Sequence, residues 1–352
     1  MKLFSPFKVR EIELRNRIVV SPMCEYSAKE GHPQTWHLVH LGSRAIGGAG
    51  LVFTEASAVE ERGRISSADT GIYDDAHVES WRPIVEFIRE HGAVPGMQLA
   101  HAGRKASTAP PWTGGKPVLP QDGGWVPVAP SAIAFDAGYT TPRELTVAEI
   151  GEIVGAFKKS AERARAAGFE VIEIHAAHGY LLHQFLSPLS NTRTDEYGGS
   201  FENRARMTLK VVRAVREIWP SRLPVFVRVS ATDWKEGGWD LAQTIELARQ
   251  LKALGVDLID VSSGGAVPGV KIPFGPGYQT GFAEAIRREV GMATGAVGMI
   301  SEPVQAETIL STEQADLVFL ARELLRDPYW PRRAAKALDV KIKAPVQYER
   351  AW

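Results

Sequence analysis

Residues 146–180 read TVAEIGEIVGAFKKSAERARAAGFEVIEIHAAHGY and contain one full cycle of the pattern that decides the fold. The first part, Thr146–Ala167, carries apolar residues at helical spacing. The short apolar run Val171-Ile172-Glu173-Ile174 then predicts a buried strand. That strand leads directly into His175-Ala176-Ala177-His178-Gly179-Tyr180, so two imidazoles and a phenol are delivered where a strand ends.

The same alternation extends over most of the 352 residues. Seven further short runs rich in β-branched residues predict strands at 17–20, 51–54, 94–99, 225–229, 258–261, 296–300 and 317–320. Further helical patterns cover Asn203–Trp219, Leu241–Leu254 and Pro303–Leu310, and their cap or first-turn residues are Glu202, Asp240 and Pro303. Eight strands alternating with helices predict one closed parallel (β/α)8 barrel, a TIM barrel, formed by a single domain over residues 1–352. An open doubly wound sheet is the alternative, but no G-x-G-x-x-G motif follows the first strand.

Two segments interrupt this alternation. Residues 104–145 are rich in Pro, Gly and Trp and form a long insertion after the third strand. Loops of this length are usually lids or binding loops, so we expect a lid region here. The C-terminal tail, residues 344–352, reads APVQYERAW and places Arg350 between two aromatic residues. An arginine between two aromatic residues is unusual in a free tail, so we expect the tail to pack against a protein surface.

Bulk composition narrows the class of protein. The chain has 41 basic and 41 acidic residues and therefore no electrostatic footprint of a nucleic-acid binder or a membrane-surface protein. It has no apolar stretch of the ~20 residues that a membrane-spanning helix needs, and the N-terminal residues lack the apolar core of a signal peptide. A lone cysteine, Cys24, excludes an internal disulfide and a multi-cysteine metal site. We therefore expect a cytoplasmic protein that acts on a small molecule.

Polar residues collect at the carboxyl ends of the predicted strands, where the active site of a TIM barrel lies. In the run 225–230, alternation places Phe226, Arg228 and Ser230 on one face and three valines on the other, so Arg228 must point into the barrel mouth. Gln98 points inward by the same argument, and its neighbours Gly96 and Ala100 are small enough to let a flat ligand approach. An internal ion pair between Arg228 and a carboxylate is the alternative interpretation.

Gly298 and Arg322 follow the seventh and eighth strands. Barrels of this type often bind a phosphate there, although a tight turn and a surface charge would explain the two residues equally well. Together with Arg228 and Gln98, they indicate a ligand with a flat polar head and a phosphate tail. Flavin mononucleotide (FMN) fits this description.

The His-x-x-His pair also raises the hypothesis of a metal-dependent barrel hydrolase that uses His175 and His178. Positions i and i+3 of a continuing strand face opposite ways, so the chain must curl after His175 for both rings to reach one pocket. Further ligands would have to come from His101, Asp260 or Glu173, and these form no recognisable metal-binding spacing. A flavin-binding protein without turnover is a third hypothesis.

Several motifs together resemble those of the Old Yellow Enzyme family of FMN-dependent ene-reductases, in particular its bacterial xenobiotic-reductase, thermophilic-like branch. They span nearly the whole chain: Asn16-Arg17-Ile18, Ser21-Pro22-Met23-Cys24, 98–105, 129–133, 173–181, 190–200 and 322–328. Ala321 departs from the pattern, because glycine is usual there in this family.

The resemblance implies a role for each candidate residue. The residues implied to contact FMN are Ser21, Pro22, Met23, Cys24, Ala56, Gln98, Arg228, Gly298, Ala321 and Arg322. His175 and His178 would bind a substrate carbonyl oxygen, Tyr180 would donate the proton, and Tyr26 would line the substrate side. Arg350 and Trp352 resemble C-terminal residues that reach a neighbouring subunit's site, which implies a homodimer or homotetramer.

The resemblance also implies a reaction in two half-reactions at one site. NADPH (or NADH) would deliver a hydride to flavin N5 and leave. An α,β-unsaturated carbonyl compound, a related activated alkene or a nitro compound would then accept that hydride, and Tyr180 would protonate the α-carbon.

Overall fold

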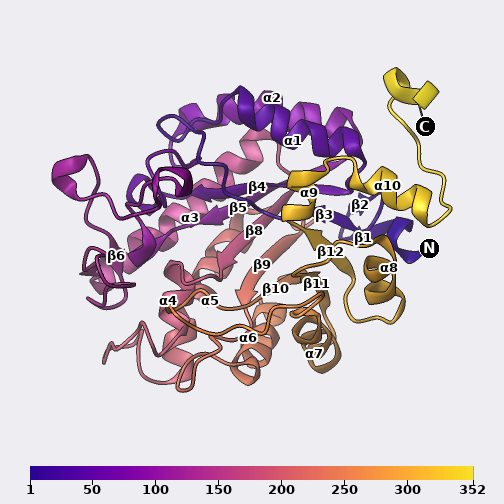
Figure 1. Ribbon diagram of the computed structural model, residues 1–352. Coiled ribbons are helices and arrows are strands. Elements are labelled where there is room, and N and C mark those ends of the chain that lie inside the picture. The colour runs from indigo at the N-terminus through magenta and orange to yellow at the C-terminus, as the bar shows by residue number, and fades with distance from the viewer. Residues whose placement is uncertain (352) are drawn as a thin grey trace.

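The computed structural model describes residues 1–351, and Figure 1 shows a closed barrel of eight parallel strands surrounded by helices. The barrel strands follow one another in chain order, and β12 pairs with β3 to close the ring. Their bounds are β3 (Ile18–Val20), β4 (Leu51–Ala58), β5 (Val94–Ala100), β8 (Val171–Ala176), β9 (Val225–Ser230), β10 (Leu258–Ser262), β11 (Ala293–Val297) and β12 (Leu317–Leu320). The predicted TIM barrel is therefore confirmed.

The helices lie outside the ring of strands (Figure 1). They are α1 (Thr35–Gly47), α2 (Asp75–Glu90), α3 (Val147–Ala167), α4 (Leu181–Leu186), α5 (Phe201–Ile218), α6 (Leu241–Ala253), α7 (Thr280–Val290), α8 (Pro303–Ser311), α9 (Arg322–Arg326) and α10 (Trp330–Ala337). Asp240 caps α6 by accepting the Gln243 N–H, and Pro303 is the first residue of α8, as predicted. In α5 the cap is Ser200, while Glu202 lies in the first turn.

The seventh strand begins earlier than the predicted run 296–300, because β11 covers Ala293–Val297. Glycine is a poor strand former, so Gly295 obscured the first half of this strand. Inside the barrel, a Cβ at Gly295 would lie 2.2 Å from the Phe319 ring, so packing requires the glycine. Gly298, with φ of 120°, ends the strand.

Three phenylalanines fill the interior of the barrel. The ring centroid of Phe53 lies 6.1 Å from that of Phe226 and 6.2 Å from that of Phe319. A Cβ at Gly96 would lie 2.6 Å from the Phe53 ring. The expectation that Gly96 makes room for a flat ligand is therefore wrong, because its missing side chain makes room for Phe53 instead.

The N-terminal hairpin of β1 (Phe7–Val9) and β2 (Ile12–Leu14) covers the amino ends of the strands. The Arg10 guanidinium donates hydrogen bonds to the carbonyl oxygens of Ser221 and Gly255, which precede β9 and β10. No helix within residues 1–351 is long and apolar enough to cross a membrane.

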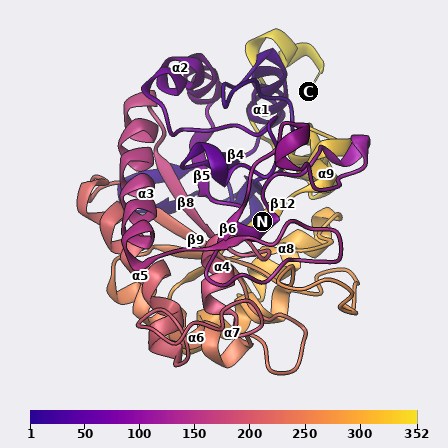
Figure 2. The ribbon, with the colours of Figure 1, turned by 90° about the vertical axis from the view of Figure 1, so that its left-hand side faces the viewer.

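The insertion, residues 104–145, joins β5 to α3 and includes the short strands β6 (Val128–Ala129) and β7 (Arg143–Glu144). It lies at the left of Figure 1, opposite the two termini, and in front of the barrel in Figure 2. The Trp125 Nε1–H donates to the Arg62 carbonyl oxygen at 2.9 Å, and Arg104 Nη2 donates to the Ala266 carbonyl oxygen at 2.7 Å. The insertion therefore covers loops at the carboxyl ends of the strands, where a lid would lie.

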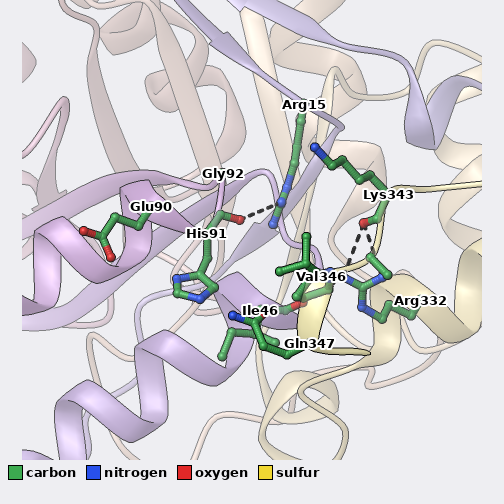
Figure 3. Close-up of a pocket in the computed structure, with 11 residues that line it drawn as sticks. Arg15, Ile46, Glu90, His91, Gly92, Arg332, Lys343, Val346 and Gln347 are labelled. Carbon is green, nitrogen blue, oxygen red and sulfur yellow. Dashed lines mark hydrogen bonds between the residues drawn. The ribbon is translucent and has the colours of Figure 1, made fainter. Parts of the chain in front are cut away.

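The C-terminal tail leaves the barrel at the opposite end. Residues 343–347 border a cavity of about 340 Å³ beside the last residues of α1 and α2, and the Lys343 carbonyl oxygen there accepts hydrogen bonds from Arg332 (Figure 3). Beyond it, the 3₁₀ helix Val346–Ala351 contains no buried residue and projects from the body of the molecule (Figure 1). The described part of the tail therefore does not reach this chain's own barrel mouth.

Candidate active site

The strand β8 and the turn that follows it bring His175, His178 and Tyr180 together. The strand ends at Ala176, and the chain then curls because His178 and Gly179 both adopt left-handed backbone conformations, with φ of 58° and 71°. As a result, the His175 ring centroid lies 5.2 Å from that of His178 and 5.1 Å from that of Tyr180. The curl that the sequence requires for a shared pocket is present.

Burial sets the protonation of these three groups. It lowers the pKa of His175 and of His178 well below the ordinary value, and the positive charge of Arg228 lowers both further. Both rings are therefore neutral at pH 7, and each carries a single N–H donor. Burial also raises the pKa of Tyr180 well above its ordinary value, so the phenol keeps its proton.

The two histidines differ in the contacts of their ring nitrogens. His178 Nε2 lies 2.7 Å from Ser262 Oγ. His175 is 3% exposed, and its Nδ1 has no hydrogen-bond partner among residues 1–351. A buried polar atom of this kind normally has a partner, so a polar ligand fits here.

A layer of buried polar side chains inside the barrel contains the two inward residues predicted at the flavin head. Arg228 points inward, where its Nη2 donates to Ser21 Oγ at 3.1 Å and its Nε lies 2.9 Å from Asp260 Oδ2. Gln98 Nε2 donates to Glu173 Oε1 at 2.7 Å. The internal arginine–carboxylate pair considered as an alternative is therefore present as well, with Asp260 as the carboxylate.

Sequence reasoning considered Glu173 and Asp260 only as metal ligands and missed their place in this layer. The alternation of side chains along each strand could have revealed it. Glu173 pairs in register with Phe226, and Asp260 pairs with Arg228, so the side chains of both carboxylates lie on the inward face. Burial raises the pKa of both carboxyls, that of Asp260 to about 6, and the Asp260 charge raises that of Glu173 further. Glu173 Oε2 has no hydrogen-bond partner within residues 1–351.

The three residues predicted at the phosphate end line one cavity. Gly298, Ala321 and Arg322 border a space of about 360 Å³ at the carboxyl ends of β11 and β12. Ser262 also lines it and connects it to His178. The orphaned polar atoms at one end and this cavity at the other fit a ligand with a polar head and an anionic tail.

A small apolar cluster lies against Tyr180. Its buried members are Ile65, Ala102 and Ala106, and Cys24, Tyr26, Trp125 and Tyr180 pack against them. Ala56 borders a small gap that is also lined by Ile65, Ala102 and Tyr180. Burial raises the pKa of Cys24 well above its ordinary value, so Cys24 remains a thiol. Sequence reasoning missed Ile65 and Trp125, because neither lies at a strand end.

The remaining predicted site residues lie after β3, in the C-terminal tail, or outside the described residues. Pro22 and Met23 come after β3 and Ser21, and Met23 packs against the main core. Arg350 is exposed in the C-terminal tail and does not join the site of its own chain. Trp352 lies outside the described residues.

The closed barrel, with buried polar groups and a cavity at the carboxyl ends of its strands, is an arrangement that suits a flavin oxidoreductase built on a TIM barrel. The family described as "NADH:flavin oxidoreductase / NADH oxidase family" matches residues 2–341, and the chain belongs to this family. The resemblance to the Old Yellow Enzyme family is therefore confirmed.

Individual relatives and solved structures also match this chain over most of its length. The NADPH dehydrogenase of Bacillus licheniformis is 52% identical over 353 residues, which cover 100% of this chain and 99% of that protein. The structure of morphinone reductase in complex with tetrahydroNAD is 29% identical, with a TM-score of 0.80, and the match covers 98% of this chain and 93% of that one. A 2-naphthoyl-CoA reductase complex has a TM-score of 0.87 at 26% identity over 96% of this chain. This chain spans about half the length of that reductase, 52%.

The protein is thus an oxidoreductase that uses FMN and a nicotinamide hydride donor, NADPH or NADH, as expected. The metal-dependent hydrolase is not favoured, because the family to which the chain belongs consists of NADH:flavin oxidoreductases.

Proposed function

We propose that this enzyme is an ene-reductase, which reduces the carbon–carbon double bond of α,β-unsaturated carbonyl compounds, related activated alkenes and nitro compounds. The observation that supports it is the convergence of His178 and Tyr180 on His175, whose ring centroid lies 5.2 Å and 5.1 Å from theirs. Two neutral N–H donors beside a protonated phenol suit a substrate that must be both polarised and protonated.

The two histidines would donate hydrogen bonds to the substrate carbonyl oxygen. As negative charge develops on this oxygen, preorganised donors in a buried site stabilise it, as in an oxyanion hole. The pKa of both imidazoles is lowered, so they donate without competing as acids. Tyr180 holds the only one of these three protons that we assign to transfer, and it would protonate the α-carbon.

The cofactor would lie between the two ends of the site. Gln98 and Arg228 would hold its polar head, Gly298, Ala321 and Arg322 its phosphate, and residues 21–24 with Ala56 would run along the ring. Bound FMN supplies hydride chemistry at N5, in a ping-pong cycle that nicotinamide and substrate share.

The substrate side would be apolar apart from the clamp for its oxygen. Tyr26, Ile65 and Trp125 belong to one hydrophobic cluster with Tyr180. Apolar walls with a few convergent polar groups are typical of small-molecule sites. A compact, largely apolar enone matches this lining better than a highly charged substrate does.

We also propose that Arg350 and Trp352 complete the site of a second copy, in a homodimer or homotetramer located in the cytoplasm. The support is geometric: the tail leaves near the ends of α1 and α2, and its last turn, Val346–Ala351, buries nothing on its own barrel.

A panel of enones, nitroesters and quinones tests the reaction. The holoenzyme should oxidise NADPH when an enone is present, and the product should be the saturated carbonyl compound. Replacing His175 and His178 with Ala should slow flavin reoxidation by enone by about 100-fold, as expected for loss of oxyanion donors. Tyr180→Phe should slow product formation while FMN stays bound. Unchanged reoxidation in the histidine variants would remove these roles.

A further inference from the structure

The turn Ala177–Tyr180 is strained, and side chains from other elements hold it in place. His178 and Gly179 are consecutive left-handed residues, and a non-glycine residue in this region persists only when its surroundings fix it. The His178 N–H donates to Ser230 Oγ at 2.9 Å, and Lys105 Nζ donates to the His178 carbonyl oxygen at 2.9 Å. Gln184 Nε2 donates to the Gly179 carbonyl oxygen at 2.7 Å.

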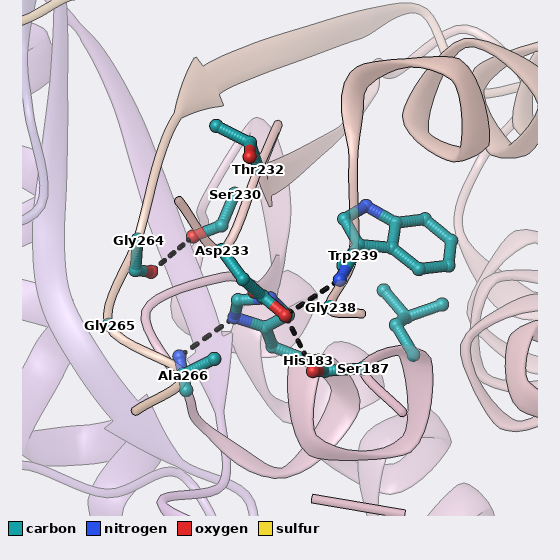
Figure 4. A network of polar contacts seen from close by, with 12 residues as sticks. His183, Ser187, Ser230, Thr232, Asp233, Gly238, Trp239, Gly264, Gly265 and Ala266 are labelled. Carbon is teal, nitrogen blue, oxygen red and sulfur yellow. Dashed lines mark hydrogen bonds and ion pairs between the residues drawn. The ribbon is translucent and has the colours of Figure 1, made fainter. Parts of the chain in front are cut away.

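The remaining amide of the turn is held by His183. The Gly179 N–H donates to His183 Nδ1 at 2.9 Å. Because a backbone amide can only donate, Nδ1 must be unprotonated and the ring must carry its proton on Nε2. His183 Nε2 lies 2.9 Å from Asp233 Oδ1, and both side chains are 0% exposed (Figure 4). His183 is therefore a neutral ring whose orientation Asp233 fixes.

Asp233 is itself held from two further directions. Ser187 Oγ donates to Asp233 Oδ2 at 2.6 Å, and the Trp239 N–H donates to the same oxygen at 2.8 Å (Figure 4). Burial raises the pKa of Asp233, but His183 and these hydrogen bonds outweigh it and leave the pKa below its ordinary value. The group is an ionised carboxylate at neutral pH; its Oδ2 accepts from Ser187 and Trp239, and its Oδ1 lies beside His183 Nε2.

The same arrangement recurs at two other histidines. His37 Nδ1 accepts the Gln34 N–H at 2.9 Å, and His37 Nε2 lies 2.9 Å from Glu55 Oε1. His101 Nδ1 accepts the Gly103 N–H at 3.0 Å, and its Nε2 lies 2.8 Å from Glu60 Oε1. Of the three pairs, the one between His183 and Asp233 ends on the turn that carries His178 and Tyr180. A buried histidine away from this turn, His77, supplies a control: its Nδ1 accepts the Asp74 N–H at 3.3 Å, and its Nε2 lies 3.0 Å from the Glu30 carbonyl oxygen.

We propose that Asp233 and His183 are positioning residues, which hold the Gly179 amide and thereby place His178 and Tyr180 against the substrate. The inference rests on the proposed function, because it assumes that His178 binds the substrate oxygen. Negative charge on that oxygen grows toward the transition state, so a displaced donor lowers kcat more than it changes KM.

Two substitutions at His183 test its contact with the Gly179 N–H and its contact with Asp233 separately. In His183→Asn, the side-chain oxygen takes the place of Nδ1 and still accepts from Gly179. In His183→Gln, the side-chain nitrogen takes the place of Nε2 and keeps the contact with Asp233 but leaves Gly179 without an acceptor. His183→Gln should lower kcat for enone reduction about 10- to 100-fold at similar KM, as a displacement of about 1 Å can. His183→Asn should recover part of this loss, whereas His77→Asn should keep kcat within about twofold.

A second variant and a spectrum make the test decisive. Should His183→Gln not fold, Ser187→Ala removes one donor to Asp233, and it should still lower kcat more than His77→Asn does. In ¹⁵N-histidine-labelled holoenzyme, the His183 ring should show a protonated Nε2 and a bare Nδ1. A kcat for His183→Gln and Ser187→Ala equal to that of His77→Asn, or a proton on Nδ1 of His183, would overturn the proposal. If the unmodified enzyme reduces no enone, the proposed function fails, and the ¹⁵N spectrum still decides the positioning of the turn.

Discussion

Asp260 and Arg228 form an ion pair inside the barrel, 2.9 Å apart, at the end of the site assigned to the polar head of the flavin. Asp260 is 0% exposed and Arg228 is 6% exposed, so water screens their charges little. The carboxylate offsets part of the positive charge that the arginine would present to a reduced, negatively charged flavin. The electrostatic effect of Arg228 on the flavin therefore depends on the charge of Asp260.

Asp260→Asn should raise the midpoint potential of bound FMN. Without the carboxylate charge, less of the positive charge of Arg228 is offset, and this positive charge stabilises the reduced flavin. For a two-electron couple, a rise of about 30 mV in midpoint potential corresponds to about 1.4 kcal/mol. A redox titration of the holoenzyme, followed by flavin absorbance, measures the change. The surface variant Glu79→Gln on α2 serves as the control, and a potential that stays constant or falls in Asp260→Asn would contradict the prediction.

Asp69 gives a second residue-scale prediction, for stability against pH. Burial and the Glu55 charge raise its pKa to about 7, against about 3.9 in an unfolded chain. The stability that the protonated form contributes is thus complete below pH 4 and lost as pH rises toward 7. Asp69→Asn removes this dependence, which amounts to at most about 4 kcal/mol. Urea unfolding at pH 4.5 and 7.5 should show a smaller difference in the variant, and equal differences would refute the assignment.

At the scale of elements, two glycines, one in a strand and one in a helix, have opposite roles. A Cβ at Gly295 in β11 would lie 2.2 Å from the Phe319 ring, whereas a Cβ at Gly155 in α3 would meet nothing within 4 Å. The strand glycine is therefore required by the packing of the barrel. The helix glycine only raises the conformational entropy of the unfolded chain.

Alanine at these two positions should shift stability in opposite directions. Gly295→Ala should lower the free energy of unfolding by about 1–3 kcal/mol through overpacking. Gly155→Ala should raise it by about 0.5–1 kcal/mol. Denaturant titrations of both variants, monitored by tryptophan fluorescence and circular dichroism, measure the two changes. A stable Gly295→Ala protein would mean that Phe319 moves aside at little cost.

On the scale of the whole molecule, the two ends of the barrel have different roles. The insertion covers the carboxyl ends of the strands, where the candidate site lies, and the N-terminal hairpin covers the amino ends. The C-terminal tail leaves from the amino end beside the cavity of Figure 3. A tail that contributes to a site must therefore contribute to that of another copy.

Removal of residues 344–352 should lower kcat/KM for enone and weaken self-association, while FMN stays bound. Arg350→Ala should lower kcat/KM about tenfold, the effect of one charged hydrogen bond, without changing the oligomer. Steady-state kinetics and light scattering of both variants measure these effects. A truncated enzyme with the kcat/KM of the full chain would contradict the shared site.

The sequence by itself determined the barrel and most of the polar residues at its mouth. Each strand and helix has a local period, and strand parity alone pointed Arg228 and Gln98 inward, because side chains alternate along a strand wherever it lies. The roles of His175, His178 and Tyr180 remain proposals. The structure adds that the chain curls after β8 as those roles require.

Only the tertiary structure decided which distant residues meet. Asp260 became the partner of Arg228, and Asp233 the partner of His183, once strands and loops far apart in sequence closed into one ring. Gly96 makes room for Phe53 and not for a ligand, and that too depends on a neighbouring strand. A local pattern fixes the direction of a side chain, but its contacts depend on closure, because closure sets which residues face one another across the barrel.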